Sequence, residues 1–359
     1  MKVVTVVGAR PQFIKASAVS REFPKRNVEE VIVHTGQHYD ANMSDIFFKE
    51  LGIPTPRYNF EIRSSRHGEM TGRMLESIET VLLGEKPDWV LIYGDTNSTL
   101  AGALAAAKLH IPIAHVEAGL RSFNRAMPEE VNRIMADHLS SILFSPTELG
   151  RKNLISEGIP STKISVVGDV MYDVSQYYGS LANKNKILLQ RLGLEEKKFI
   201  LLTCHRQENT DNIDRLKAIF LGLNDVAEKM PVVCPIHPRT KKYLLDAEWF
   251  KPSKELKLID PIGYLDMVTL EHTSALIATD SGGVQKEAFF YEVPCVTLRD
   301  ETEWEELIEG GWNILVPPLS KEVVRDGVLS RLNRMGKKIF PYGDGKASQA
   351  IVDAMVRGV

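Results

Sequence analysis

The sequence predicts an α/β protein built from two doubly wound halves, each with a parallel sheet covered by helices on both faces. Short apolar runs that end at Gly, Pro or a polar residue alternate with longer amphipathic stretches, which is the pattern of buried parallel strands joined by crossover helices. The alternation starts afresh after about residue 170. A length of 359 residues also suits two domains of roughly 150–200 residues better than one.

The strand candidates follow in order along the chain. In the first half they are Val3–Val7, Glu30–His34, Trp89–Tyr93, Ile111–Val116, Ile142–Ser145 and Lys163–Val167. In the second half they are Phe199–Thr203, Val232–Cys234, Leu256–Ile259, Ala275–Ala278 and Cys295–Leu298. Amphipathic helices are expected between them, for example over Thr71–Leu83, Thr99–Leu109 and Ile213–Lys229.

The boundary between the halves is expected near residues 170–190. The segment Tyr178–Leu192 is polar and weakly patterned, as a linker followed by a helix would be, and Gly193 is a plausible end for that helix. We therefore expect an N-terminal domain over 1–175 and a C-terminal domain over 176–359, whose last helix packs back on the N-terminal domain. Doubly wound sheets bind ligands at the carboxyl ends of their strands, so we sought functional residues there and expect a cleft between the halves.

Composition excludes several classes of protein. With 44 Lys+Arg against 47 Asp+Glu, the net charge of −3 is a poor match to a general nucleic-acid binder. The 3 cysteines, Cys204, Cys234 and Cys295, are isolated, which disfavours a disulfide framework or a structural zinc site. No apolar stretch approaches the roughly 18–20 residues of a transmembrane helix. We expect a cytoplasmic protein without a membrane or nucleic-acid partner.

Standard cofactor motifs are missing from the sequence. The first strand leads into Gly8-Ala9-Arg10-Pro11 and not into G-x-G-x-x-G, and no phosphate-binding GxxxxGK[ST], HExxH or GxSxG motif occurs. Neither His cluster described below has the spacing of metal ligands. We therefore expect no redox cofactor and no metal.

Candidate site residues of the first half follow its strands. Arg10 and Lys15 lie on the opening turns of a helix that begins near Pro11 and could hold a phosphate or carboxylate, or they could be solvated cations. Asp95 follows Trp89–Tyr93 and is either an acid/base group or an N-cap. Glu117 ends a buried strand, where poor solvation favours a raised pKa and proton transfer near neutral pH. A structural ion pair with Arg121 or His115 is the alternative.

A helix start is predicted at Met127-Pro128-Glu129-Glu130. Glu130 and Arg133 are spaced i, i+3 and could pair on one face, whereas Glu129 points elsewhere. Judged on this motif alone, Glu129 is more often a surface acid favoured by the helix dipole than a catalytic group.

The second half contributes cations and a glycine-rich turn. His205 and Arg206 follow its first strand, and His237 follows the next, where each could contact a negatively charged leaving group. Ser281, Gly282 and Gly283 open a helix whose backbone N–H groups can cradle a diphosphate, and Glu287 one turn later could accept both ribose hydroxyls. A capped glycine-rich turn without a ligand is the alternative for this segment.

Seven motifs together resemble the non-hydrolysing UDP-N-acetylglucosamine 2-epimerases over essentially the whole chain. They are G-A-R-P-Q at 8–12, G-D-T at 94–96, H-V-E-A-G-L-R at 115–121, P-E-E-V-N-R at 128–133, H-R-Q-E-N at 205–209, H-P-R at 237–239 and D-S-G-G-V-Q-K-E at 280–287. The resemblance implies the two-domain fold called GT-B, shared with nucleotide-sugar glycosyltransferases, and a homodimer. Fold alone does not separate the epimerases from those transferases.

The resemblance also implies a mechanism, anti elimination of UDP to a 2-acetamidoglucal followed by re-addition with the proton delivered to the other face of C2. This route needs no NAD. On the matching positions, Asp95, Glu117 and Glu129 are the acid/base carboxylates and His205 assists departure of UDP. Arg10, Lys15, His205 and Arg206 face the phosphates or the sugar, and Ser281, Gly282, Gly283 and Glu287 hold the diphosphate and ribose.

Departures from the common pattern bear on the substrate. Ala9 and Gln12 replace Thr and Glu of the plain enzymes, and the stretches at 34–48, 93–104 and 299–304 look like the branch acting on UDP-2,3-diacetamido-2,3-dideoxyglucuronate. A neutral Gln12 beside Arg10 would remove a repulsive charge near the C6 carboxylate of that substrate. Plain UDP-N-acetylglucosamine is the alternative substrate. Gln37, His38, Arg66 and His67 lie where contacts for activation by substrate would be sought.

Overall fold

The chain folds into two compact units. The computed structural model describes residues 1–36, 52–64, 66–182 and 187–358. Unit 1 comprises Met1–Val174 together with Phe340–Val359, and unit 2 comprises Ser175–Ile339. Each unit is built on one parallel sheet, which confirms the predicted α/β class.

Unit 1 holds a seven-stranded parallel sheet in the order β3-β2-β1-β4-β5-β6-β7. Its strands are β1 (Lys2–Val7), β2 (Glu29–His34), β3 (Tyr58–Asn59), β4 (Trp89–Tyr93), β5 (Ile113–Val116), β6 (Ile142–Ser145) and β7 (Ile164–Val166). Its helices are α1 (Arg10–Ser20), η1 (Pro24–Arg26), α3 (His67–Glu85), α4 (Asn97–Lys108), α5 (Pro128–Leu139), α6 (Glu148–Ser156), η2 (Ser161–Lys163), the start of α7 (Val170–Ala182) and α16 (Ala347–Arg357).

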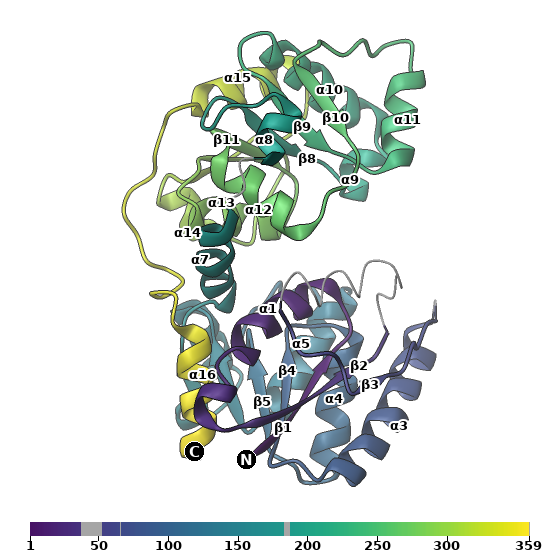
Figure 1. Ribbon diagram of the computed structural model, residues 1–359, viewed down its shortest axis with the longest axis vertical. Coiled ribbons are helices and arrows are strands. Elements are labelled where there is room, and N and C mark those ends of the chain that lie inside the picture. The colour runs from purple at the N-terminus through teal and green to yellow at the C-terminus, as the bar shows by residue number, and fades with distance from the viewer. Residues whose placement is uncertain (37–51, 65, 183–186, 359) are drawn as a thin grey trace. The chain divides into compact units, whose positions relative to one another are not determined.

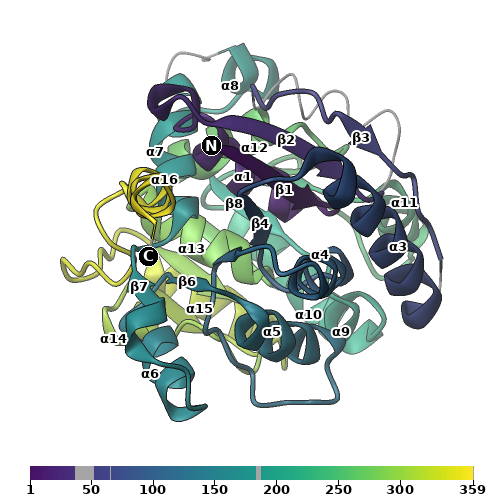
Figure 2. The same ribbon diagram turned by 90° about the horizontal axis from the view of Figure 1, so that it is seen from below.

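Both faces of this sheet are covered, which explains the continuous apolar runs of its strands. Val4 and Val6 of β1 belong to a core shared with α3, α4 and α5. Helices α1 and α16 contact one another and lie on the opposite face (Figures 1 and 2). A strand buried on both faces has no polar side to alternate with, so its sequence shows no period of two.

Unit 2 holds a six-stranded parallel sheet in the order β10-β9-β8-β11-β12-β13. Its strands are β8 (Ile200–Thr203), β9 (Val232–Pro235), β10 (Leu256–Ile259), β11 (Leu276–Thr279), β12 (Cys295–Thr297) and β13 (Asn313–Leu315). Its helices, after the end of α7, are α8 (Ile187–Leu192), α9 (Gln207–Thr210), α10 (Ile213–Ala227), α11 (Pro238–Asp246), α12 (Tyr264–Thr273), α13 (Gly282–Phe290), α14 (Glu305–Glu309) and α15 (Lys321–Arg331). The main core lies between this sheet and helices α10 and α15.

The C-terminal segment returns to unit 1. Asp173 caps α16, since its carboxylate accepts hydrogen bonds from the backbone N–H of Ala347 and Ser348 at 3.1 and 2.7 Å. The N–H of Asp169 donates to the carbonyl of Tyr342 at 3.0 Å. The range 176–359 expected for the second domain therefore includes a segment, Phe340–Val359, that lies in unit 1.

Three predictions about the elements were incomplete or wrong. The short strands β3 and β13 were not predicted, and the expected linker at Tyr178 is the C-terminal part of α7. Tyr178 is buried there against Tyr264, with the ring centroids 5.5 Å apart, and this tertiary packing stabilises a helix whose own sequence pattern is weak.

The structure also bears on the cysteines and on membrane-spanning helices. Cys204, Cys234 and Cys295 are all free and buried. Among the helices that the structure describes, none combines the length and apolar character needed to cross a bilayer.

Candidate active site

Both sheets have the strand order that creates a topological switch point, where ligands of doubly wound proteins bind. In unit 1 the chain reverses its direction of growth between β1 and β4, and in unit 2 between β8 and β11. The segments that follow these four strands carry most of the predicted site residues, while Glu117 and Glu129 follow β5 and His237 follows β9.

Helix α1 begins directly after β1 and presents Arg10 and Lys15. Arg10 is exposed on the first turn, whereas Lys15 is only 9% exposed and its Nζ contacts Oε2 of Glu117. Gly8 allows the tight approach of this loop to β2 and α4, because a Cβ there would lie 2.1 Å from side-chain oxygens of Thr35 and Ser98. The start of α1 is therefore closely packed against β2 and α4. Its two cations, Arg10 and Lys15, lie at the carboxyl edge of the sheet.

Gln12 is a structural residue in this loop. It is 2% exposed, its Oε1 accepts from the N–H of Gly8 and Ala9, and its Nε2 donates to the carbonyl of Tyr93. A fourth hydrogen bond joins Nε2 to Oγ1 of Thr99 at 3.0 Å. All four hydrogen bonds of the amide are made inside the unit, which gives Gln12 a structural role in this loop. An effect of its neutral charge on a substrate carboxylate stays a prediction.

Asp95 is paired with Arg133, a partner that was not predicted from the sequence. Its Oδ2 lies 2.5 Å from a guanidinium nitrogen of Arg133 in α5, and the other side of that guanidinium bonds Glu130 at 2.9 Å. The N-cap of α4 is Thr96, whose hydroxyl accepts from the N–H of Thr99, so the capping alternative for Asp95 is wrong. The predicted Glu130–Arg133 pair is confirmed.

Glu117 follows β5 in a left-handed backbone conformation with φ of 73°. Its carboxylate contacts Lys15, not Arg121 or His115, so the ion pairs considered for it in the sequence are replaced by a different one. Gly94, which follows β4, has φ of 62°, a conformation that favours glycine, and a Cβ there would lie 3.2 Å from Oε2 of Glu117. The loops after β4 and β5 thus place Asp95 and Glu117 on the same edge of the sheet, each beside a cation.

Glu129 and Glu130 differ in burial on the first turn of α5. Glu129 is exposed, whereas Glu130 is 1% exposed and accepts hydrogen bonds from the N–H of Ser122 and Phe123 at 2.9 Å each. Burial acts to raise the pKa of Glu130, but these N–H groups and Arg133 outweigh it and leave that pKa below its ordinary value. Glu130 therefore anchors the loop before α5, and Glu129 is the acid of this pair available to a ligand.

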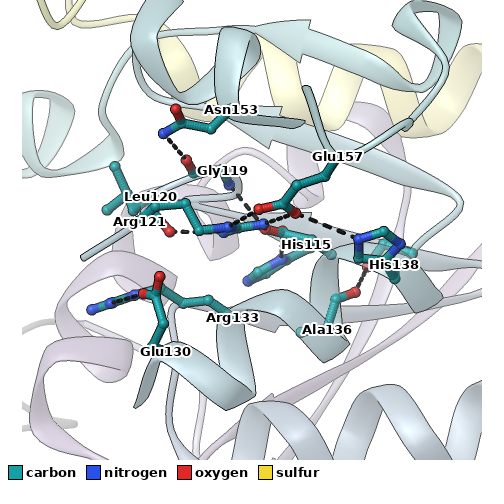
Figure 3. Close-up of polar contacts among 12 residues, drawn as sticks. His115, Gly119, Leu120, Arg121, Glu130, Arg133, Ala136, His138, Asn153 and Glu157 are labelled. Carbon is teal, nitrogen blue, oxygen red and sulfur yellow. Dashed lines mark hydrogen bonds and ion pairs between the residues drawn. The ribbon is translucent and has the colours of Figure 1, made fainter. Parts of the chain in front are cut away.

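A buried polar network lies beneath the loop after β5 (Figure 3). Arg121 donates to both oxygens of Glu157 at 2.7 Å and pairs with Asp137, and Glu157 also lies 3.4 Å from His138. Asn153 donates to the carbonyl of Gly119 at 2.9 Å. The sequence motif contained His115 and Arg121, but the distant partners Asp137 and Glu157 carry no local signal that would have identified them.

In unit 2, Asp280 organises the loop after β8. It is fully buried and accepts hydrogen bonds at 3.1 Å from the N–H groups of His205 and Arg206 and from Nδ2 of Asn209. Its Oδ1 also lies 3.3 Å from Nδ1 of His205. The imidazole of His205 remains 63% exposed, so the loop is held by its backbone while its side chain stays accessible.

The glycine-rich turn opens α13 as expected. Ser281 is the N-cap, its hydroxyl accepting from the N–H of Val284 at 3.5 Å, and Gly282 and Gly283 form the first turn. Trp304 donates from its indole N–H to the carbonyl of Gly282 at 2.9 Å and stacks under Lys286, whose Nζ is 4.3 Å from the ring. Glu287 is 9% exposed one turn later. The exposed N–H groups at this helix start are suited to bind an anion.

His237 is exposed after β9, at the residue before α11. It lies at the carboxyl edge of the unit 2 sheet like His205, although on a different strand. Across the part of the chain that the structure describes, no three His, Cys, Asp or Glu residues are grouped so as to hold a metal ion. Gln37, His38 and most of the stretch at 34–48 lie outside the described residues. Arg66 is exposed beside Glu69, and His67 begins α3, where Nδ1 lies 3.2 Å from Nδ2 of Asn97.

The two sheets and the polar residues at their switch points define a GT-B fold of the kind found in nucleotide-sugar enzymes. The sequence profile of the family described as UDP-N-acetylglucosamine 2-epimerase matches residues 21–356. The chain belongs to this family and is an epimerase, as the resemblance in the sequence predicted.

Relatives cover the whole chain. A UDP-2,3-diacetamido-2,3-dideoxy-D-glucuronate 2-epimerase from Pseudomonas aeruginosa is 51% identical over 99% of this chain and 100% of its own. A UDP-N-acetylglucosamine 2-epimerase from Methanocaldococcus jannaschii is 48% identical over 100% of both chains. The crystal structure of the M. jannaschii enzyme with UDP-GlcNAc and UDP has a TM-score of 0.86 and covers 100% of both chains. The Neisseria meningitidis enzyme bound to UDP-GlcNAc also has a TM-score of 0.86, at 34% identity.

Proposed function

We propose that this protein interconverts the C2 epimers of a UDP-2-acetamido sugar without releasing free sugar. UDP leaves by anti elimination to give a 2-acetamidoglucal, and re-addition of UDP delivers a proton to the other face of C2. The C2 proton is not acidic, because no carbonyl is conjugated to it, so removal of the proton and departure of UDP have to be assisted together. The reaction needs acid/base groups for C2 and cations for the departing diphosphate.

The observation that carries this proposal is the set of carboxylates at the carboxyl edge of the unit 1 sheet. Asp95 is held beside Arg133 and Glu117 beside Lys15, while Glu129 is exposed on the first turn of α5. A paired carboxylate is available as a base once a ligand displaces or shares its cation. Asp95 follows β4, while Glu117 and Glu129 follow β5, so acid/base groups occupy three positions at one edge of the sheet.

Unit 2 supplies the chemistry expected for a nucleotide diphosphate. The start of α13 offers N–H groups to the phosphates, Glu287 is placed one turn later for the ribose, and His205 and Arg206 provide donors on the adjacent loop. His237 lies on the same edge of this sheet, and Arg10 does so in unit 1. Relatives crystallised with UDP-GlcNAc and UDP support a nucleotide ligand of this kind.

For the substrate we propose UDP-2,3-diacetamido-2,3-dideoxyglucuronate, with UDP-N-acetylglucosamine as the alternative. The support is the resemblance of the stretches at 93–104 and 299–304 to that branch and the name of the P. aeruginosa relative. Overall identity does not distinguish the two substrates, since relatives named for each are 51% and 48% identical to this chain.

Proton NMR in deuterated water tests both the proposed reaction and the proposed substrate. The purified protein is incubated separately with UDP-N-acetylglucosamine and with UDP-2,3-diacetamidoglucuronate, without an acceptor. Deuterium at C2 and a manno product from the diacetamido acid alone are expected. Turnover of only the plain sugar overturns the substrate assignment but not the reaction. Free sugar and UDP accumulating together indicate a hydrolase, and an unchanged C2 proton with both sugars overturns the proposed reaction.

A further inference from the structure

His115 lies at the centre of the unit 1 site without reaching its surface. It is fully buried in β5, two residues before Glu117. Its Nδ1 is 2.7 Å from Oδ1 of Asp137, and its Nε2 is 2.8 Å from the carbonyl oxygen of Gly94. Both ring nitrogens are therefore within hydrogen-bond distance of an oxygen, with no room for water between them.

The chemistry of the Gly94 oxygen determines where one ring proton is. A carbonyl oxygen can only accept a hydrogen bond, so Nε2 must donate to Gly94. Asp137 contacts Nδ1 with one oxygen, and with the other it accepts from Arg121 at 2.7 Å and from the N–H of Gly119 at 3.2 Å. Burial acts to raise the pKa of Asp137, but its contacts with His115 and Arg121 outweigh burial and leave that pKa below its ordinary value. Both nitrogens of the ring are thus engaged inside the unit.

The charged partners of this cluster are paired. Arg121 contacts Asp137 and donates to both oxygens of Glu157. A buried charge is costly unless it is paired and hydrogen-bonded, and Arg121 and Asp137 meet both conditions.

The same contacts hold the backbone on either side of the candidate catalytic carboxylates. His115 bonds the carbonyl of Gly94, which has φ of 62° and immediately precedes Asp95. Asp137 bonds the N–H of Gly119, which has φ of 83° and follows Glu117 by two residues. One buried pair thus fixes the turns that carry both Asp95 and Glu117.

We propose that His115 is a positioning residue, whose ring is held by Asp137 and donates from Nε2 to the carbonyl of Gly94, and so fixes Asp95 on the same edge of the sheet as Glu117. The ring is fully buried and exchanges no proton with substrate. The effect on turnover rests on the proposed function, whereas the hydrogen bond from Nε2 does not.

Nitrogen-15 NMR of the protein labelled at histidine tests the hydrogen bond from Nε2 without any substrate. The His115 signal is identified by resonance assignment of the unmodified protein, and Nε2 is expected to carry the proton that it donates to Gly94. A His115 ring with Nε2 deprotonated overturns the proposal. This measurement needs no variant, so it remains decisive if His115→Gln fails to fold.

Kinetics then test the positioning role. In His115→Gln we expect kcat for C2 deuterium exchange to fall about 10- to 100-fold with UDP affinity within threefold, because misplacing a reacting group by about 1 Å costs on that order. His138→Gln is the matched control, since it removes a half-exposed histidine at the edge of the same network and should leave kcat unchanged. Unchanged kcat in folded His115→Gln, or an equal loss in His138→Gln, contradicts the positioning role.

Discussion

At the scale of single residues, the site stores conformational energy at Glu117. A non-glycine residue with φ of 73° is strained, at a cost on the order of 1–3 kcal/mol, and such strain persists only where surrounding contacts hold it. Here the N–H groups of Glu117 and Ala118 both donate to the carbonyl of Phe144 at 3.1 Å, and Lys15 contacts the carboxylate. The strained turn directs the carboxylate toward the Gly94 loop.

Replacing Glu117 by Gln tests whether that carboxylate transfers a proton. We expect C2 deuterium exchange to fall by about 10²–10⁴-fold, the usual contribution of a general acid or base, with UDP binding retained. Exchange is measured by NMR and UDP affinity by calorimetry. Glu148→Gln, on the exposed start of α6, is the matched control. Turnover near that of the control would remove Glu117 from the mechanism.

Replacing Gln12 by Glu tests whether this position acts on structure or on substrate choice. A buried carboxylate would lose both donor bonds, to the carbonyl of Tyr93 and to Thr99, so we expect a loss of about 1–3 kcal/mol in unfolding free energy. Urea unfolding measures this loss, and KM is determined for both candidate sugars. A selective rise in KM for the carboxylate-bearing sugar at unchanged stability would support the specificity interpretation.

Local motifs predicted where the candidate residues lie, but not what they contact. Asp95, Glu117, His205 and the 281–283 turn were found because polar residues after apolar strands are visible in sequence. Their partners Arg133, Lys15 and Asp280 lie up to 102 residues away along the chain, as for Lys15 and Glu117. Such pairings depend on the strand order of the folded sheet, which the local pattern does not encode.

At the scale of elements, the packing of β2 against β1 and α1 buries an acid. Burial raises the pKa of Glu30 to about 7, against the opposing hydrogen bond from Thr5 at 2.6 Å. The unfolded chain loses this proton near pH 4.5, so the stabilisation is complete below that pH and is lost as the pH rises through about 7.

Glu30→Gln should therefore flatten the dependence of stability on pH. Between pH 5 and pH 8 the wild-type protein should lose about 2–3 kcal/mol of unfolding free energy through this one group, and the variant should not. Urea titrations at both pH values measure the difference, with exposed Glu29→Gln as the neighbouring control. Parallel curves for wild type and Glu30→Gln would show that Glu30 titrates normally.

A substitution in helix α13 distinguishes a role in nucleotide binding from a role in the chemical step. Glu287→Ala removes the carboxylate expected to bind the ribose, so UDP affinity should fall tenfold or more while turnover at saturating sugar changes little. Calorimetry with UDP and exchange kinetics at high sugar concentration give the two values. A variant impaired only in the chemical step would place the ribose elsewhere.

Strands with continuous apolar runs were predicted within one or two residues, because burial on both faces imposes that composition. The two-residue β3 was not predicted, since it is too short for any pattern, and β13 was also missed, although the equally short β7 and β12 were predicted. Helix α7 was taken in part for a linker because its polar residues obscure the apolar positions that its packing on α12 requires.

At the scale of the whole molecule, the chain passes twice between the two units, after Val174 and after Ile339. Near both crossing points, residues of the first segment of unit 1 contact the C-terminal segment. Gly168 lies so close to the carbonyl of Tyr342 that a Cβ would be 2.6 Å from it, and Asp173 bonds the start of α16. The C-terminal segment is therefore an integral part of unit 1, although unit 2 intervenes in the sequence.

This arrangement predicts which unit responds when the attachment of α16 is weakened. Asp173→Ala removes the carboxylate that accepts from Ala347 N–H and from the N–H and hydroxyl of Ser348, and loss of such a cap costs about 1–2 kcal/mol. Hydrogen exchange followed by mass spectrometry should show faster exchange in α16 and in α1, which contacts it, with α10 and α15 of unit 2 unaffected. Asp344→Ala, an exposed position in the same segment, should leave all four helices unchanged. Faster exchange in α10 and α15 with α16 still protected would mean that the C-terminal segment stabilises unit 2 instead.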